Sequence, residues 1–180
     1  AFDHNGDGLT DLIWWTENSA NHLTWTATGS GNFQTGSVPS PGAGSFPLVG
    51  RYDADQRTDI LRYGPGSVPA AVAFADTGLS HLTKLSINGD FEPLIGNWNG
   101  DAQAMSEIWW WNTDSTRSDA FWTPSGSGFT NQATLPTKVP WERHWAITGH
   151  FDGDNAVAIA MKQVGEDGVQ EHRSLHQPAL

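Results

Sequence analysis

Short runs of apolar residues, separated by polar and glycine-rich stretches, dominate the pattern along the chain. Each run is only a few residues long and is rich in β-branched or aromatic side chains, which are typical of β-strands. No stretch keeps the period of about 3.6 residues that an amphipathic helix requires. We therefore expect strands in the segments 12–15, 22–28, 60–63, 70–75, 107–111, 119–123 and 156–161.

Turn-forming residues lie between these segments. Glycine, serine, asparagine or proline cluster at 29–32, 64–66 and 125–128, and such clusters mark tight turns and loops. The neighbouring tryptophans Trp14 and Trp15 are expected to point to opposite faces of one strand, which suits a sheet that is buried on both faces. The pattern predicts an all-β chain with about four strands in each unit.

The same unit recurs along the chain at intervals of about 50 residues. Full copies occupy 46–64, 92–111 and 145–162, and the opening residues match the later part of the unit. Four-stranded units of this size most often assemble radially as the blades of a β-propeller. We therefore predict a single repeat region over 1–180. Its units, three full and a partial fourth, start near residues 1, 47, 93 and 146.

The opening stretch, AFDHNGDGLTDLIWW, has the front half of a calcium loop. Asp3, Asn5 and Asp7 place oxygen-bearing side chains on alternate positions, and the glycines between them let the backbone fold around a cation. An EF-hand continues to a bidentate Glu at the twelfth position, but Trp14 stands there. The next carboxylate, Asp11, is at the ninth position, so we predict a loop shorter than an EF-hand.

Composition and charge exclude several classes of function. The formal net charge is −11, with 20 acidic and 9 basic residues, so we expect no nucleic-acid partner. The chain has no cysteine, which excludes disulfides and thiolate metal sites, and it has no apolar run of about 18 residues to span a membrane. A carboxylate calcium loop with few lysines indicates an extracellular or cell-surface protein. Because the chain starts on Ala1 inside a motif, we expect a processed chain or a fragment.

The first loop, FDHNGDGLTDL, resembles the hallmark of the FG-GAP or VCBS repeats of integrin-like β-propellers. This resemblance implies a calcium ion held by the side chains of Asp3, Asn5, Asp7 and Asp11 and by the backbone carbonyl of Leu9. It also implies adhesion, lectin-like or accessory roles attached to enzymes or toxins. Complete propellers of this kind have more blades than this chain, so the resemblance leaves three ways to close a ring: further blades from missing chain, a second copy, or an unusually small ring.

The other three loops depart from this pattern in different ways. The second has Arg51 at the first position, where its cation competes with the metal. Two extra residues precede the last acid of the third loop, and the fourth has His150 first and Ala158 in place of the last acid. The ligands that the resemblance carries over are Asp53, Asp55 and Asp59 in the second loop, Asn97, Asn99, Asp101 and Glu107 in the third, and Asp152 and Asp154 in the fourth.

We interpret the metal as a clip that holds a turn, because a loop that spends five ligands on one ion leaves little coordination for a substrate. Most tryptophans suit packing between blades, whereas Trp141 and Trp145, in the loop-like PWERHW, are candidates for stacking against a sugar. We expect a non-catalytic module for a glycan or protein partner. The alternatives are a polysaccharide-active enzyme that uses rim carboxylates, and a structural subunit of an extracellular assembly.

Overall fold

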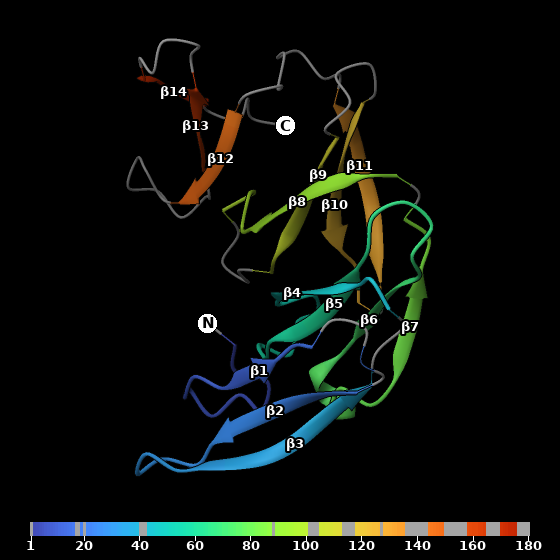
Figure 1. Cartoon of the computed structure of the whole chain (residues 1–180), viewed down its shortest axis with the longest axis vertical. Helices are drawn as coiled ribbons and strands as arrows, with labels where there is room; N and C mark the ends of the chain where they lie inside the picture. The colour runs from blue at the N-terminus through green and yellow to red at the C-terminus, as the bar shows by residue number, and fades with distance from the viewer. Residues whose placement is uncertain are drawn as a thin grey trace. The chain divides into compact units, whose positions relative to one another are not determined.

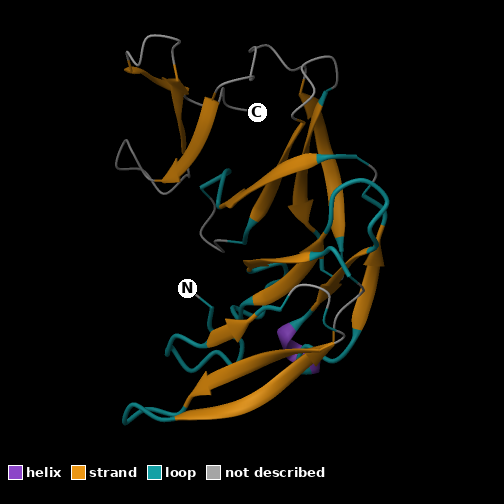
Figure 2. Cartoon of the chain, in the orientation of Figure 1, coloured by secondary structure: helices purple, strands orange, loops and turns teal. Residues whose placement is uncertain are grey.

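The computed structural model describes residues 2–16, 19, 21–39, 43–87, 89–100, 105–112, 118–126, 128–135, 144–149, 158–164 and 170–175. In this part of the chain the fold is all-β: strands β1 to β14 form four antiparallel sheets, with one turn of 3-10 helix (Figures 1 and 2). The chain divides into two compact units. The first holds the two N-terminal sheets and is the better described of the two.

The first sheet has three strands in the order β1-β2-β3, and Figure 1 shows them in blue. They are β1 (Leu12–Trp14), β2 (Asn21–Ala27) and β3 (Phe33–Pro39). Before β1, Phe2 forms an isolated bridge with Asp11. Trp14 is half-exposed on one face, while the Trp15 ring stacks on His22 at 3.5 Å on the other. The two tryptophans therefore point to opposite faces, as their neighbouring positions predicted.

The second sheet has four strands in the order β4-β5-β6-β7. They are β4 (Phe46–Gly50), β5 (Asp59–Tyr63), β6 (Ala70–Ala73) and β7 (Leu82–Leu85). The 3-10 turn η1 (Ala75–Thr77) connects β6 to β7 and appears purple in Figure 2. Every residue of β5 and β6 is buried, so these strands form the centre of the first unit.

The two N-terminal sheets share one hydrophobic core. Ile60 of β5 and Ala73 of β6 pack with Val38 of β3, and Phe2 joins them from the loop before β1. Leu79, which follows η1, completes the cluster and is 1% exposed. This packing holds the first loop and β3 against the η1 turn.

Two further sheets follow along the chain. One has four strands: β8 (Phe91–Gly96), β9 (Glu107–Asn112), β10 (Asp119–Pro124) and β11 (Phe129–Leu135). The other has three: β12 (His144–Gly149), β13 (Ala158–Val164) and β14 (Gln170–Leu175). In the first of these sheets the Trp110 ring makes edge contacts with Phe91 and Trp122.

The all-β prediction is confirmed, since the described part of all seven expected segments is strand, apart from one or two residues at some ends. The sheets follow the expected units along the chain, and the first lacks the opening strand that the second has in β4. The assembly of these sheets into a propeller stays a prediction. Among the described residues, no helix has both the length and the apolar character that crossing a membrane requires.

Candidate functional site

The last carboxylate of the second loop ties that loop to the sheet. Asp59 is fully buried at the start of β5. Its Oδ2 accepts a hydrogen bond from the Tyr52 N–H at 2.7 Å, and its Oδ1 accepts one from the Ala75 N–H at 2.8 Å. We call this arrangement, in which the last acid of a loop binds the N–H of the second loop residue, the carboxylate clip. It satisfies backbone donors that would each cost about 1–3 kcal/mol if they were buried without a partner.

The clip recurs in the first and third loops. Asp11 Oδ2 accepts the His4 N–H at 3.0 Å, and Asp11 Oδ1 accepts the Ala27 N–H at 2.8 Å. Glu107 Oε2 accepts the Trp98 N–H at 2.7 Å. The longer side chain of Glu107 thus makes the same backbone contact across the two extra residues of its loop. The sequence identified these acids as metal ligands but did not show that they also bind the backbone.

Three carboxylates of the second loop meet at one point. One oxygen each from Asp53, Asp55 and Asp59 lies within 4.8 Å of the other two. Asx-type hydrogen bonds hold the loop in shape, with the Asp55 N–H donating to Asp53 Oδ1 at 3.0 Å and the Arg57 N–H to Asp55 Oδ1 at 2.8 Å. Among the described residues, these three aspartates are the group that could hold a metal ion, and we call them the acidic cluster.

The acidic cluster is electrostatically strained when no cation balances it. Burial raises the pKa of Asp59 from 3.8 to about 7, and the charges of Asp53 and Asp55 add to this rise. Burial also raises the pKa of Asp53, with the charges of Asp55 and Asp76 acting in the same direction. A bound cation reverses this balance, because it favours the charged form of every carboxylate beside it.

The donor set of the acidic cluster fits a hard divalent cation. All three side chains offer oxygen, which calcium and magnesium prefer. Each Asp59 oxygen accepts one N–H, and a carboxylate oxygen keeps a second lone pair for a metal. The ion pair between Arg57 Nε and Asp55 Oδ2 is long at 3.8 Å and lies at the surface. Arg57 therefore balances little of the cluster's charge.

In the first loop, the side chains fold the loop on itself. Asp3 accepts the N–H groups of Gly6 at 2.8 Å and Gly8 at 2.9 Å, and these two glycines have φ of 76° and 82°. Asp7 Oδ1 accepts the Leu9 N–H at 2.8 Å. The geometry does not gather Asp3, Asp7 and Asp11 into a group of three as close as the acidic cluster. Calcium at the first loop stays a prediction.

The remaining candidates are only partly placed. Asn99 Nδ2 donates to Glu107 Oε1 at 2.8 Å, and Asn97 directly precedes the clip residue Trp98. Trp145 lies on β12 opposite Lys162, but its side chain is outside the described part of the structure. The residues outside the described ranges altogether are Asp101, Trp141, Asp152 and Asp154.

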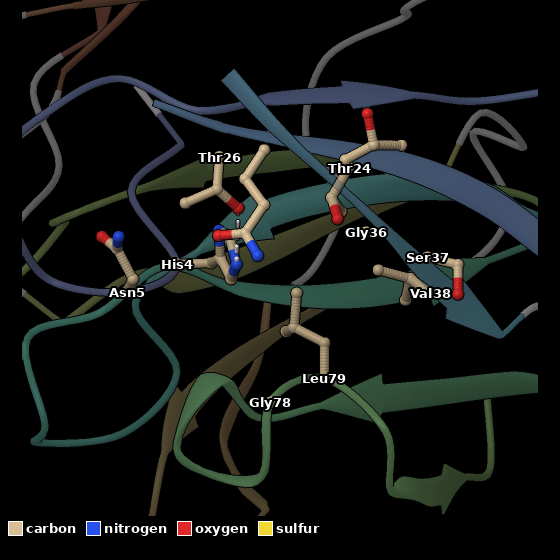
Figure 3. Close-up of a pocket in the computed structure, with 11 residues that line it drawn as sticks. His4, Asn5, Thr24, Thr26, Gly36, Ser37, Val38, Gly78 and Leu79 are labelled. Carbon is tan, nitrogen blue, oxygen red and sulfur yellow. Dashed lines mark hydrogen bonds between the residues drawn. The ribbon is translucent and has the colours of Figure 1, made fainter. Parts of the chain in front are cut away.

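A pocket that the sequence did not indicate lies against the first sheet. Its volume is about 390 Å³. Figure 3 shows the residues that line it: His4, Asn5, Thr24, Thr26, Gln34, Thr35, Gly36, Ser37, Val38, Gly78 and Leu79. The available signals were His4, at a position where the other loops have Tyr52, Trp98 and Phe151, and the inward threonines of β2. Neither signal shows by itself that these side chains meet.

Comparison with known families finds a match over the part of the chain that holds the first two loops. Residues 3–62 match the sequence model of the FG-GAP-like repeat family, and no curated protein matches the chain. The match begins at the first ligand position of the first loop and ends within β5. The chain therefore contains an FG-GAP-like repeat, and its sequence and all-β structure agree with the FG-GAP/VCBS repeat family that its first loop indicated.

Proposed function

We propose that this chain is a non-catalytic, calcium-stabilised β-propeller module that binds a glycan or protein partner outside the cell. The FG-GAP-like repeat supports a β-propeller-like module. The observation that carries the proposal is the acidic cluster of Asp53, Asp55 and Asp59, whose oxygens converge within 4.8 Å. Calcium is the ion that carboxylate loops of this composition favour, and weak sites of about 0.1–1 mM are filled outside cells.

The role of the ion follows from where the acidic cluster lies. Asp59 is both a member of the cluster and the residue of the second-loop clip. An ion bound to the three carboxylates would stabilise the same loop that the clip joins to β5 and η1. The metal would thus support the fold, and partner binding would belong to other surfaces.

Thermal unfolding with and without calcium tests this proposal. With about 5 mM calcium and a dissociation constant of about 0.1–1 mM, the expected gain is about 1–2 kcal/mol. For a chain of this size that gain raises Tm by about 2–8 °C. The measurement is tryptophan fluorescence against temperature, with excess chelator as the reference and sodium chloride of equal ionic strength as the control.

Substitutions then locate the ion. Asp55→Asn keeps the Oδ1 acceptor for the Arg57 N–H and removes one charge, so it should abolish the calcium effect and leave Tm in chelator unchanged or higher. The exposed Asp90→Asn, matched in charge, should keep the calcium effect. Asp7→Asn reports on the first loop in the same way. A wild-type Tm that is equal in calcium and chelator would contradict the proposal.

The blade number and the way a ring closes are predictions of the same proposal. Native mass spectrometry in a calcium-containing volatile buffer counts subunits and bound ions in one spectrum. A monomer with bound calcium supports a chain completed by further blades or a small ring, and a dimer supports completion by a second copy. The enzyme alternative requires two carboxylates about 5–10 Å apart in one cleft.

A further inference from the structure

We infer that the pocket shown in Figure 3 binds a neutral, hydroxyl-rich ligand, that is a saccharide, and that His4 orients it. This inference rests on the proposed binding function and names the ligand class and the site. The pocket volume of about 390 Å³ falls within the range of known small-molecule sites. It is close to the size of one or two sugar rings.

One wall of the pocket is the inward face of the β2–β3 hairpin. Alternation along β2 places Thr24 and Thr26 on this face, and the register pairs them with Gly36 and Gln34 of β3. Gly36 leaves the wall open, because a Cβ at that position would lie 2.7 Å from Thr24 Oγ1. The wall therefore presents two hydroxyls and one amide to the cavity, and these groups both donate and accept hydrogen bonds.

His4 supplies the most strongly oriented polar group. Its ring stacks on Phe2 at 5.4 Å with an interplanar angle of 14°. Its Nδ1 lies 2.6 Å from Oδ2 of the buried Asp11. Because a carboxylate accepts, we place a hydrogen on Nδ1, and in the neutral form of the ring Nε2 is then the acceptor. Nε2 is 3.4 Å from Thr26 Oγ1, a long contact that leaves both atoms able to bind a ligand hydroxyl.

Packing alone does not account for a histidine at this position. Tyr52, Trp98 and Phe151 stand at the equivalent positions of the other loops, so an apolar or phenolic ring suits the second loop position. What His4 adds is a nitrogen on each side of the ring, one bound to Asp11 and one on the pocket side beside Thr26 (Figure 3). The Asp11 carboxylate thus serves the clip of the first loop and also fixes the orientation of the His4 ring.

Leu79 forms the opposite wall and adopts a strained backbone. It has φ of 59° and follows Gly78, which has φ of 65°. A left-handed conformation costs a residue with a Cβ about 1–2 kcal/mol. Hydrogen bonds from Gly78 N–H to Ala75 O at 2.8 Å and from Leu79 N–H to Phe74 O at 3.1 Å hold the turn.

This turn closes one side of the pocket. Figure 3 shows the Leu79 side chain pointing toward the cavity opposite the β3 strand, which contributes Val38. Both side chains belong to the buried core, so they close the base of the cavity and the polar wall provides most of the surface that a ligand would contact. Backbone strain held at a cavity wall is typical of binding sites.

The charge of the lining excludes an anionic ligand. Among the described residues that line the pocket, none has a permanently charged side chain. The chain carries a net charge of −11, so phosphates and carboxylates are repelled from its surface. Hydroxyls, an amide and one oriented imidazole instead match a neutral ligand that donates and accepts hydrogen bonds.

Saturation-transfer difference NMR on the full chain tests the inference. The probe is a mixture of the methyl pyranosides of glucose, galactose, mannose, fucose and N-acetylglucosamine. We expect saturation transfer to at least one sugar, with a dissociation constant in the millimolar range. His4→Phe and Thr26→Val keep the packing of their sites and should weaken this binding by about tenfold. Thr83→Val, on β7 and outside the pocket lining, is the matched control and should bind like the wild type.

Absence of transfer to all five sugars, or equal binding by all three variants and the wild type, would overturn the inference. The calcium dependence of Tm is measured on the same samples, so the two proposals fail separately. If calcium stabilises the chain but no sugar binds, the proposal of a calcium-stabilised module stands and the saccharide pocket is refuted. If a sugar binds but calcium has no effect on Tm, the saccharide pocket stands and the calcium proposal is refuted.

Discussion

Thr58 and Asp3 exchange two hydrogen bonds and so join the first two loops directly. The Thr58 N–H donates to Asp3 O at 2.8 Å, and the Asp3 N–H donates to Thr58 Oγ1 at 3.1 Å. The Arg57 side chain also lies against Gly6, where a Cβ would be 3.3 Å from its Cγ. The matched region, 3–62, therefore contains two loops that support each other as well as their own strands.

Thr58→Val should destabilise the chain by about 1 kcal/mol, because it removes the Oγ1 acceptor and leaves the Asp3 N–H with no described partner. Urea unfolding followed by tryptophan fluorescence measures the change. Thr83→Val, a half-buried strand position, should change stability by less than about 0.5 kcal/mol. Equal effects of the two substitutions would contradict a specific role for the link between the loops.

Asp59→Ala should cost about 2–4 kcal/mol in excess chelator, because it leaves the buried N–H groups of Tyr52 and Ala75 without their acceptor. Relief of the repulsion among the three carboxylates offsets part of this cost. The exposed Asp90→Ala provides the control and should be nearly neutral. A loss below about 1 kcal/mol for Asp59→Ala would show that the clip contributes little to stability.

The raised pKa of Asp59 predicts two opposite pH dependences, one for the stability of the metal-free chain and one for the stabilisation that calcium adds. The folded state keeps the Asp59 proton up to about pH 7, whereas the unfolded chain releases it near the ordinary pKa of 3.8. Between these values the folded state binds more protons, so the stability of the metal-free chain should fall as pH rises from about 4 to about 7. Calcium requires charged carboxylates, so its added stabilisation should grow over the same range.

Urea midpoints of metal-depleted protein, recorded across this pH range with and without added calcium, measure both slopes. Asp59→Asn removes the titrating group and should flatten both curves. A metal-free midpoint that rises steadily from about pH 4 to about pH 7 would contradict the assignment of the raised pKa to the folded state.

The strands could be predicted from sequence because their signal is local. Residues 60–63 are apolar or aromatic apart from Arg62. Asp59, the last acid of the second loop, precedes them and Gly64 follows, and the structure has β5 at Asp59–Tyr63. Likewise the loop acids could be found from their spacing. The face to which each side chain points follows from the strand period of two, and Trp14 and Trp15 accordingly lie on opposite faces.

The site could be predicted only in part, because its contacts join segments that are distant in sequence. Whether Asp53, Asp55 and Asp59 converge depends on loop hydrogen bonds, and the Ala75 N–H that holds Asp59 lies 16 positions further along the chain. The pocket requires the first loop, the hairpin and the η1 turn together. No periodicity carries that information, so the sequence ranked the first loop above the second and did not indicate His4 as a pocket residue.

Removing the buried charge of Arg62 should stabilise the folded chain. Arg62 is fully buried in β5, and its Nε, Nη1 and Nη2 have no hydrogen-bond partner among the residues that the structure describes. Burial lowers its pKa to about 10. At the equivalent positions of the first and third units stand Trp14 and Trp110, so an apolar side chain suits this place in the sheet. Arg62→Met retains a flexible apolar stem and should stabilise the chain by about 1–3 kcal/mol.

Two measurements check the effect of Arg62. The urea midpoint should rise for Arg62→Met and stay nearly constant for the partly exposed Arg57→Met. The pKa of His22 is lowered by burial and, to a smaller extent, by the Arg62 charge. In Arg62→Met it should therefore rise, yet remain below its ordinary value, in an NMR titration of the imidazole. A loss of stability together with an unchanged His22 pKa would show that the guanidinium has a partner beyond the described residues.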